Sequence, residues 1–236
     1  MLHVEGALMH QLLLFIKGTD SRICNVVVEA KNGMIMFCRE GYRPTFPSAM
    51  TYCLLGKIPV GHTCQYTLPP QVTSTCQQDN VQSLTIHTCE EMVSWTTSKT
   101  TTRCPIVPRY ARPLLTDGHL RLMQAPEQFP SMTIPHAEFL DICCEMYAVE
   151  QVTVIFHAKE QEYAFHGVKE GVDLRITSAP PSSAAIGAYH VLAYQLKMLE
   201  PFLHLNQVKL VLLHACAMAL VQDNVYLIME SQISRL

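Results

Sequence analysis

Apolar residues recur with helical spacing in three stretches of the chain, and each stretch predicts an amphipathic helix with one buried stripe. The stripes consist of Met9, Leu12, Leu13 and Ile16, then Phe139, Ile142, Cys143 and Met146, then Leu192, Leu196, Leu199 and Leu203. A shorter pattern covers 70–78, where Pro70 suits a first helical turn and Val72 and Cys76 share a face.

Short runs of apolar and β-branched residues between these stretches predict strands. The runs cover 23–30, 33–38, 50–55, 83–89 and 92–97 in the first half, and 152–158, 162–166, 172–177, 208–214 and 225–229 in the second. Lys31-Asn32-Gly33 and Lys159-Glu160-Gln161 predict hairpin turns between short strands.

The order of elements repeats along the chain. Each half reads helix, strands, helix, strands, and matching helices lie about half the chain apart, which predicts two tandem similar domains. Six prolines between residues 105 and 135 predict a long connector with little regular structure. We therefore expect an N-terminal domain over 1–112, a connector over 113–134 and a C-terminal domain over 135–236.

The composition limits what the protein can do. Only 16% of the 236 residues are charged and the formal charge is −3, which excludes a strongly basic nucleic-acid binder. No apolar run approaches the length of about 20 residues that a membrane span needs. The first 16 residues lack a basic region and a small-residue cleavage site, so we expect no signal peptide and read the ten cysteines as reduced thiols.

Three His-x-Cys pairs place two possible zinc ligands on one face of a strand. They are His62/Cys64, His87/Cys89 and His214/Cys216. No Cys-x-x-Cys accompanies them, so buried thiols beside hydrogen-bonded histidines are the favoured interpretation, and we expect no metal. Phosphate-binding and hydrolase motifs are missing from the sequence, so we expect no enzyme activity, no catalytic residue and no cofactor.

Several segments resemble the eukaryotic and viral type of DNA sliding clamp, the family of the proliferating cell nuclear antigen. Pro135-His-Ala-Glu-Phe-Leu-Asp-Ile-Cys-Cys-Glu-Met146 is similar to the Pro-x-x-Glu-Phe-x-x-Ile-Cys-x-x-Leu pattern that opens the family's second domain. Val154-Ile-Phe-His-Ala-Lys159 and His166-Gly-Val-Lys-Glu-Gly-Val-Asp-Leu-Arg-Ile176 resemble the strands that follow. Leu114-Leu-Thr-Asp-Gly-His-Leu120 and Ala125-Pro-Glu-Gln128 resemble the interdomain connector, and Leu196-Lys-Met-Leu199 the last helix.

The resemblance implies an α+β fold of two similar domains, with helices on one face of antiparallel sheets. It implies that subunits join head to tail into a ring, usually a homotrimer, whose helices line a hole for duplex DNA. Such a ring tethers a DNA polymerase and docks replication and repair partners through short peptide motifs. Its contact with DNA is weak and independent of base sequence. The place of action would be the nucleus or a viral replication compartment.

Three groups of residues carry the roles that the resemblance implies. Lys17, Lys197 and His10 would face DNA, although ordinary solvated helix lysines are an equal alternative. The partner-binding group is Leu120, Leu122, Met123, Ala125, Pro126 and Ile228. The subunit interface would pair the strand near 106–112, with Tyr110, Ala111 and Arg112, to the strand with Leu174, Arg175 and Ile176 of the next copy.

One departure from the family weighs on the function. The predicted helix at 136–147 carries Glu138, Asp141 and Glu145 and no lysine or arginine, and 70–80 carries no basic residue either. Two alternatives therefore stand beside a processivity factor. The first alternative is one subunit of a hetero-oligomeric clamp of the DNA-damage checkpoint type. The second is a clamp-fold interaction scaffold that does not encircle DNA.

Overall fold

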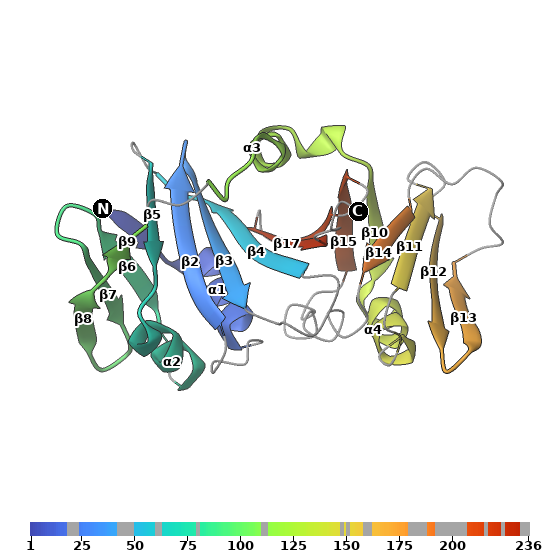
Figure 1. The fold of residues 1–236 in the computed structure, drawn as a ribbon, viewed down its shortest axis with the longest axis horizontal. Coiled ribbons are helices and arrows are strands. Elements are labelled where there is room, and N and C mark those ends of the chain that lie inside the picture. The colour runs from blue at the N-terminus through green and yellow to red at the C-terminus, as the bar shows by residue number, and fades with distance from the viewer. Residues whose placement is uncertain are drawn as a thin grey trace. The chain divides into compact units, whose positions relative to one another are not determined.

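The computed structural model describes most of the chain in thirteen pieces (Figure 1). They are residues 1–17, 24–41, 50–59, 63–78, 81–109, 113–146, 149, 152–157, 162–178, 188–191, 207–214, 217–222 and 225–231. The described residues group into two compact units, one drawn from 1–46, 51–124 and 223–228 and the other from 47–50, 125–222 and 229–236. The division at Gln124/Ala125 falls inside the segment that we predicted as a connector.

The first unit contains two antiparallel sheets. The smaller sheet has the order β1-β6-β7-β8, formed by Leu2–Val4, Ser83–His87, Met92–Thr96 and Thr101–Pro105. The larger has the order β17-β4-β3-β2-β5-β9, formed by Val225–Ser231, Met50–Lys57, Met34–Gly41, Cys24–Lys31, Cys64–Thr67 and Val107–Pro108. Of β17, residues 225–228 belong to this unit.

Helices α1 (Gly6–Lys17) and α2 (Pro70–Gln78) pack against each other in the first unit. The buried stripe of α1 includes Met9, Leu12 and Ile16, as the spacing predicts. Gly56 of β4 permits the close approach of α1, because a Cβ there would lie 2.6 Å from Leu8 Cδ1. Gly56 and its register partner Ile35 lie on the same face of the sheet. Because Leu8 of α1 contacts Gly56, this is the face that α1 covers.

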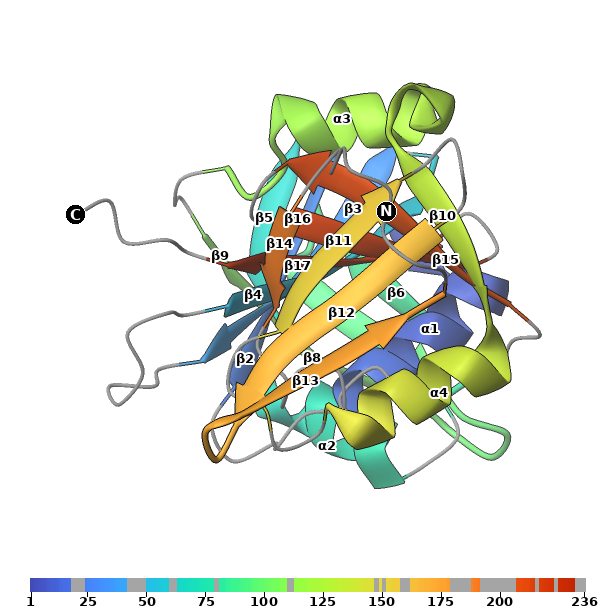
Figure 2. The same ribbon diagram turned by 90° about the vertical axis from the view of Figure 1, so that its right-hand side faces the viewer.

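The second unit repeats this order of elements. It contains β10 (Ser131–Pro135), α4 (His136–Glu145), and a sheet of order β13-β12-β11-β14 formed by Val172–Thr177, Glu162–Lys169, Val152–His157 and Ala188–Val191. Strands β15 (Gln207–His214) and β16 (Ala217–Gln222) continue from β10 in the order β10-β15-β16. Phe139 of α4 meets Phe165 of β12 edge to face, with ring centroids 6.2 Å apart, in the core of this unit. Figure 2 shows this sheet with β12 between β11 and β13, and α4 at the lower right.

The two units share one topology. The order β10-β15-β16 matches β1-β6-β7, and β14-β11-β12-β13 matches β5-β2-β3-β4. The prediction of an α+β fold with antiparallel sheets is therefore confirmed, and most predicted strands lie within a few residues of observed ones. The predicted turn at 31–33 is also confirmed, because Asn32 and Gly33 have φ of 52° and 77°, as a type I′ turn requires.

The connector differs from its prediction. Helix α3 (Asp117–Gln124), the 3₁₀ helix η1 (Pro126–Gln128) and β10 occupy most of a segment that we expected to lack regular structure. The predicted helix through Leu192–Leu203 and the turn at 159–161 lie outside the described residues. No helix in the described ranges is long and apolar enough to cross a membrane.

Candidate functional site

The outer faces of the described helices carry few positive charges. On α1, His10 and Lys17 are exposed, and Lys17 lies in the last turn, where a cation is favoured by the helix dipole. The exposed residues of α2 include Gln71, Ser74 and Gln78, which are polar and uncharged. Lys197, the third residue predicted to face DNA, lies outside the described residues.

The outer face of α4 is acidic. Glu138, Asp141 and Glu145 are exposed along it. The Tyr163 hydroxyl of β12 donates a hydrogen bond to Glu138 Oε1. Burial, with a smaller contribution from this carboxylate, raises the pKa of Tyr163 well above its ordinary value. Helices α1 and α2 of the first unit thus carry one exposed lysine, and α4 of the second unit carries three exposed carboxylates, a charge balance that does not favour phosphate contact.

A buried carboxylate fixes the start of the connector. Glu29 of β2 is 2% exposed, and its Oε2 accepts hydrogen bonds from the Leu114 backbone N–H and from Gln65 Nε2, the latter at 3.0 Å. Glu29 pairs in register with Gln65 of β5 and Met36 of β3, so all three lie on one sheet face. This face is opposite to the one that α1 covers, because Glu29 alternates with Val28 and Ala30. The connector therefore begins on the sheet face away from α1.

Helix α3 is capped by its own side chains. The Thr116 N–H donates to His119 Nδ1 at 3.2 Å, and the His119 N–H donates to Thr116 Oγ1 at 3.4 Å. This is the reciprocal pattern of a capping box, with histidine at the third helical position. His119 is 3% exposed, whereas Thr116 is exposed, so only the histidine side of the cap is shielded from water. The fixed start and the cap together give the connector a defined helical conformation.

The connector turns two of its predicted partner-binding residues inward. Leu122 and Met123 are buried at 0% and 4% exposure, and Leu120 is half-buried. Ile228, on β17, is also fully buried in the first unit, while Ala125 and Pro126 are half-buried in the second. Of the group in the first unit, only Leu120 therefore offers appreciable surface to a partner.

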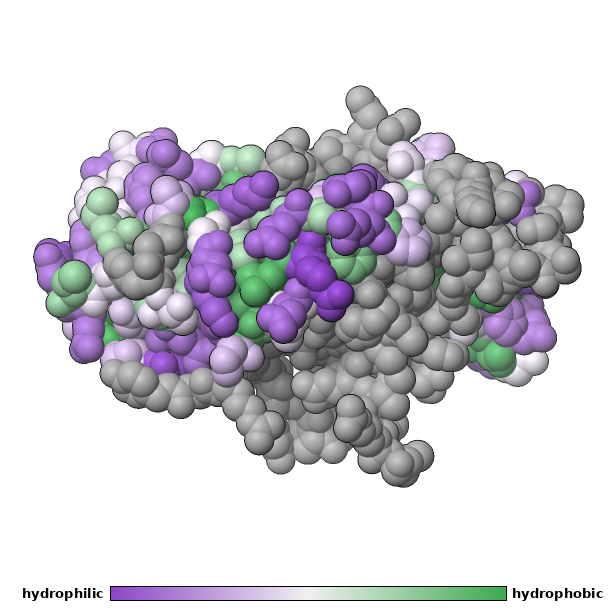
Figure 3. All heavy atoms as spheres, turned by 90° about the horizontal axis from the view of Figure 1, so that it is seen from above, coloured by the Kyte–Doolittle hydropathy of each residue, from purple (hydrophilic) through white to green (hydrophobic). Residues whose placement is uncertain are grey.

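A hollow of about 230 Å³ lies where the end of α3 meets the larger sheet. Asn32, Gly33, Met34, Lys57, Met123 and Gln124 line it. Met34 and Met123 are buried, whereas Asn32, Lys57 and Gln124 are exposed. Figure 3, which looks down on the side where Figure 1 draws α3, shows hydrophobic surface framed by hydrophilic side chains.

Glu29 and Lys57 were not predicted from the sequence, although a signal for Glu29 exists. A carboxylate inside the run Val26-Val27-Val28-Glu29-Ala30 interrupts an otherwise apolar strand, and a buried charge of this kind requires donors from another element. No comparable signal marks Lys57, whose place in the hollow depends on the register of β4.

Among the strands that end a sheet without an outer neighbour in the described part of the chain are β8 in the first unit and β13 in the second. Strand β13 contains the predicted interface residues Leu174, Arg175 and Ile176. The described part of the other predicted interface strand is short, since β9 has only the two residues Val107–Pro108. It pairs with β5 of the same unit. Tyr110, Ala111 and Arg112 lie outside the described residues.

The hydrogen-bond phase of these ladders shows which groups point outward. The Ser178 N–H donates to the Tyr163 carbonyl at 3.1 Å, so 163/178 is a hydrogen-bonded pair and such pairs alternate along β12 and β13. Asp173, Arg175 and Thr177 therefore direct their backbone groups to the free edge. The Thr97 N–H to Thr100 carbonyl bond, at 2.8 Å, gives the same analysis for β8.

On β8, the outward groups belong to Thr101, Arg103 and Pro105. Pro105 sits where its missing N–H would face away from β7, so the proline leaves the ladder intact. Each free edge thus presents three residues at alternate positions. The two edges have matching lengths for antiparallel pairing.

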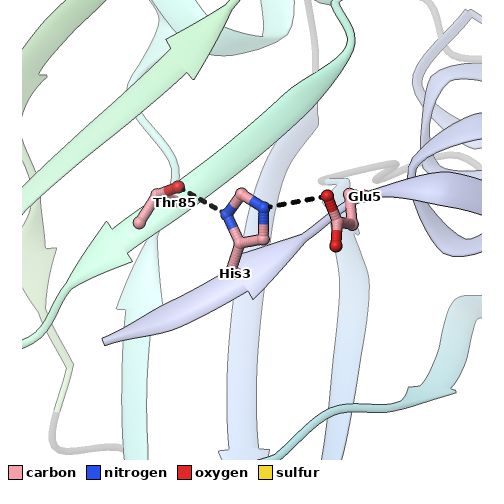
Figure 4. Close-up of polar contacts among 3 residues, drawn as sticks. All are labelled: His3, Glu5 and Thr85. Carbon is pink, nitrogen blue, oxygen red and sulfur yellow. Dashed lines mark hydrogen bonds and ion pairs between the residues drawn. The ribbon is translucent and has the colours of Figure 1, made fainter.

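A hydroxyl, an imidazole and a carboxylate are hydrogen-bonded in series on the outside of the smaller sheet (Figure 4). His3 Nδ1 lies 2.8 Å from Thr85 Oγ1, and His3 Nε2 lies 3.2 Å from Glu5 Oε2. The connectivity is that of a nucleophile, base and orienting acid. However, the His3 and Glu5 side chains are 42% and 71% exposed, so the surface encloses no substrate. The contacts tie β1 to β6 and to the start of α1.

Metal-binding clusters are not formed by the described part of the chain, in which no three His, Cys, Asp or Glu side chains come together. His87 Nε2 instead lies 3.0 Å from Ser94 Oγ across the β6–β7 ladder, and Cys89 is exposed. His62, Cys216 and the side chain of His214 are outside the described set.

Comparison with solved structures places the fold. The proliferating cellular nuclear antigen of Entamoeba histolytica superposes with a TM-score of 0.62 at 12% identity, covering 97% of each chain. The DNA polymerase sliding clamp of Bacillus subtilis gives a TM-score of 0.62 at 9% identity, and the DNA polymerase III β subunit of Thermotoga maritima 0.60 at 9%.

The match covers this whole chain but only 65% of each of these two bacterial chains. Neither a protein-family model nor a curated protein matches the sequence. With its repeated topology and these superpositions, the chain has the sliding-clamp fold.

Proposed function

We propose that the protein is a clamp-like tether, a ring-forming subunit that holds duplex DNA and docks a DNA polymerase and other peptide-motif partners. The observation that carries the proposal is the repeated topology, in which β17 pairs with β4 while their counterparts β8 and β13 have no outer neighbour among the described residues. In the first unit, the outer edge of β4 is occupied by β17. The counterpart of β4 is β13, and the counterpart of β17 in chain order is β8, so β8 of one copy would pair with β13 of the next.

The side chains of the two edges support this pairing. Leu174 and Ile176 on β13 and Cys104 on β8 are half-buried, so their apolar surface is incompletely covered in one copy. Val172 at the start of β13 is 60% exposed. Antiparallel addition of one edge to the other would cover these residues and satisfy the outward backbone groups. The partner of β13 in this proposal is β8, not the strand near 106–112.

Light scattering on the purified chain tests the ring. A closed assembly, a trimer in the simplest case, gives one species whose mass is an integer multiple of the chain and is stable on dilution into the micromolar range. A single-chain mass at these concentrations would contradict a self-assembled ring and leave a hetero-ring, in which a different clamp-fold chain supplies one edge.

Topological retention tests the tether. A ring that encircles DNA remains on a nicked circle in high salt but slides off the same DNA once it is linear, whereas a surface binder leaves both equally. On a long primed template, the polymerase product should lengthen when the ring is present. Equal loss from circular and linear DNA would exclude encirclement.

The charges of the helices favour a second candidate, a clamp-fold scaffold that binds proteins and not DNA. Helix α4 carries three exposed carboxylates, and α1 carries one exposed lysine. Lys17→Glu combined with Lys197→Glu should weaken DNA association if these helices face DNA, with exposed Lys99→Glu as a matched control. An unchanged affinity would move any DNA contact elsewhere and favour the scaffold. The nucleus or a viral replication compartment stays the proposed place of action.

A further inference from the structure

Two buried cysteines face each other across the ladder of β3 and β4. Cys38 and Cys53 are direct register partners, and their side chains are 2% and 3% exposed. Both carry thiols in the structure. Because residues directly opposite each other lie on the same sheet face, the two sulfur atoms project to the same side.

The phase of the ladder places these cysteines at the closer type of pair. The Ile58 N–H donates to the Gly33 carbonyl at 3.0 Å, so 33/58 is a hydrogen-bonded pair. The two types alternate along the register, which makes 35/56 and 37/54 hydrogen-bonded and 38/53 non-hydrogen-bonded. Directly opposed Cα atoms in such pairs are about 4.5 Å apart, within the range of about 4.4 to 6.8 Å that a disulfide bridges.

We propose that Cys38 and Cys53 form a redox modification site, a reversible cross-strand disulfide made by hydrogen peroxide. One thiol gives up its proton and attacks a peroxide oxygen as the thiolate. The O–O bond breaks, a sulfenic acid forms, and the leaving hydroxide takes up the proton to become water. The second thiol then attacks the sulfenic sulfur, forming the S–S bond and releasing a second water. Two thiols are oxidised and one peroxide is reduced, so no further reactant is required.

The position of the pair allows reaction in spite of its burial. Cys38 lies three residues before the end of β3 and Cys53 three residues after the start of β4, and residues near strand ends open locally at a lower free-energy cost than those at strand centres. The disulfide would close a hairpin of the larger sheet, next to β17 and on the face that holds Glu29. The modification does not depend on ring formation or on partner binding, so its failure and the failure of the proposed function are separate results.

Peptide mapping of the full chain tests the site. The protein is treated with hydrogen peroxide, unfolded in iodoacetamide and digested without reductant. We expect a peptide joining Cys38 to Cys53, a mass loss of about 2 Da for the intact chain, and full reversal by dithiothreitol. Burial raises the pKa of the Cys76 thiol to about 12, so this cysteine should remain reduced and carry the alkyl group instead.

Variants sharpen the result. Cys38→Ser and Cys53→Ser should each lose the linked peptide, and Cys143→Ser, which removes a buried thiol from α4, should retain it. If a serine variant does not fold, the peptide map of the unaltered chain still shows whether Cys38 and Cys53 become linked. Complete alkylation of Cys38 and Cys53 under peroxide that oxidises exposed Cys89 and Cys144 would overturn the proposal, as would linkage of either cysteine mainly to another partner.

Discussion

Glu29 is a carboxylate in the middle of an apolar strand, and its two donors come from different elements. Removing it leaves the Leu114 N–H and the Gln65 amide with less than their full set of hydrogen bonds. We expect Glu29→Ala to lower the free energy of unfolding by about 2 to 4 kcal/mol, and Glu29→Gln by less, because an amide oxygen still accepts. Urea unfolding measures both.

The matched control for Glu29 is Glu145→Ala, which removes an exposed carboxylate from the end of α4 and should change stability by about 0.5 kcal/mol or less. Equal effects of the two alanine variants would contradict the anchoring role of Glu29.

Tyr163 couples stability to high pH. Because its pKa is raised in the folded state, the unfolded chain loses the phenolic proton first as the pH rises. The stabilisation is thus fully present below the ordinary tyrosine value of about 10 and is lost above it. We expect Tyr163→Phe to flatten the decline of stability between about pH 9.5 and 11, measured by urea unfolding at each pH. An unaltered slope would mean that other groups cause the decline.

Among the elements, α3 is the one whose stability is most easily separated from the rest. Its start depends on the Thr116 hydroxyl, which accepts the His119 N–H. Thr116→Ala should cost about 1 kcal/mol and speed hydrogen exchange of the first amides of α3, including Leu120, whose N–H bonds to the Thr116 carbonyl at 3.1 Å.

The exposed Thr102→Ala on β8 serves as the control for the cap, since it should leave exchange in α3 unaltered. Faster exchange across both units, and not in α3 alone, would indicate general destabilisation in place of a lost cap.

Hydrophobic patterning predicted the elements that pack a continuous apolar face, and it failed for elements held in other ways. Helices α1 and α4 and strand β2 bury regular stripes or runs, so their spacing was sufficient. Helix α3 is held by a cap and by Leu122 and Met123 within a proline-rich segment, which hid it. Strand β8 is an exposed edge with little apolar alternation, and β1 has only three residues.

The candidate site was predictable to a smaller extent. The resemblance to sliding clamps marked the connector and β13 as candidate sites. The inward direction of Leu122 and Met123 was not predictable, because it depends on where α3 docks. The anchor at Glu29 requires two partners distant in sequence, at positions 65 and 114, which no local pattern brings together.

At the scale of the whole molecule, backbone groups at β13 decide the proposed assembly. Arg175→Pro removes an outward N–H without breaking the ladder to β12, because its pair with His166 is not hydrogen-bonded. We expect light scattering to show that Arg175→Pro lowers the assembly to smaller species, whereas Arg175→Ala, which retains the N–H, does not.

The neighbouring Leu174→Pro distinguishes assembly from folding. Its N–H points toward β12, so this change should destabilise the second unit itself. If Arg175→Pro unfolds the chain as Leu174→Pro does, or leaves the assembly size unchanged, the proposed role of this edge is wrong.

The outer edges of β8 and β13 differ from each other, so each copy has two unlike ends through which it can join its neighbours. A contact between unlike surfaces either closes on itself after a fixed number of copies or grows without limit. A copy with one surface blocked can terminate growth but cannot extend it. Arg103→Pro should block β8 as Arg175→Pro blocks β13. Mixed together, these two variants should form a dimer and nothing larger. The dimer would contain one β8–β13 contact with a known variant on each side, so a label could be placed on a chosen subunit at that contact.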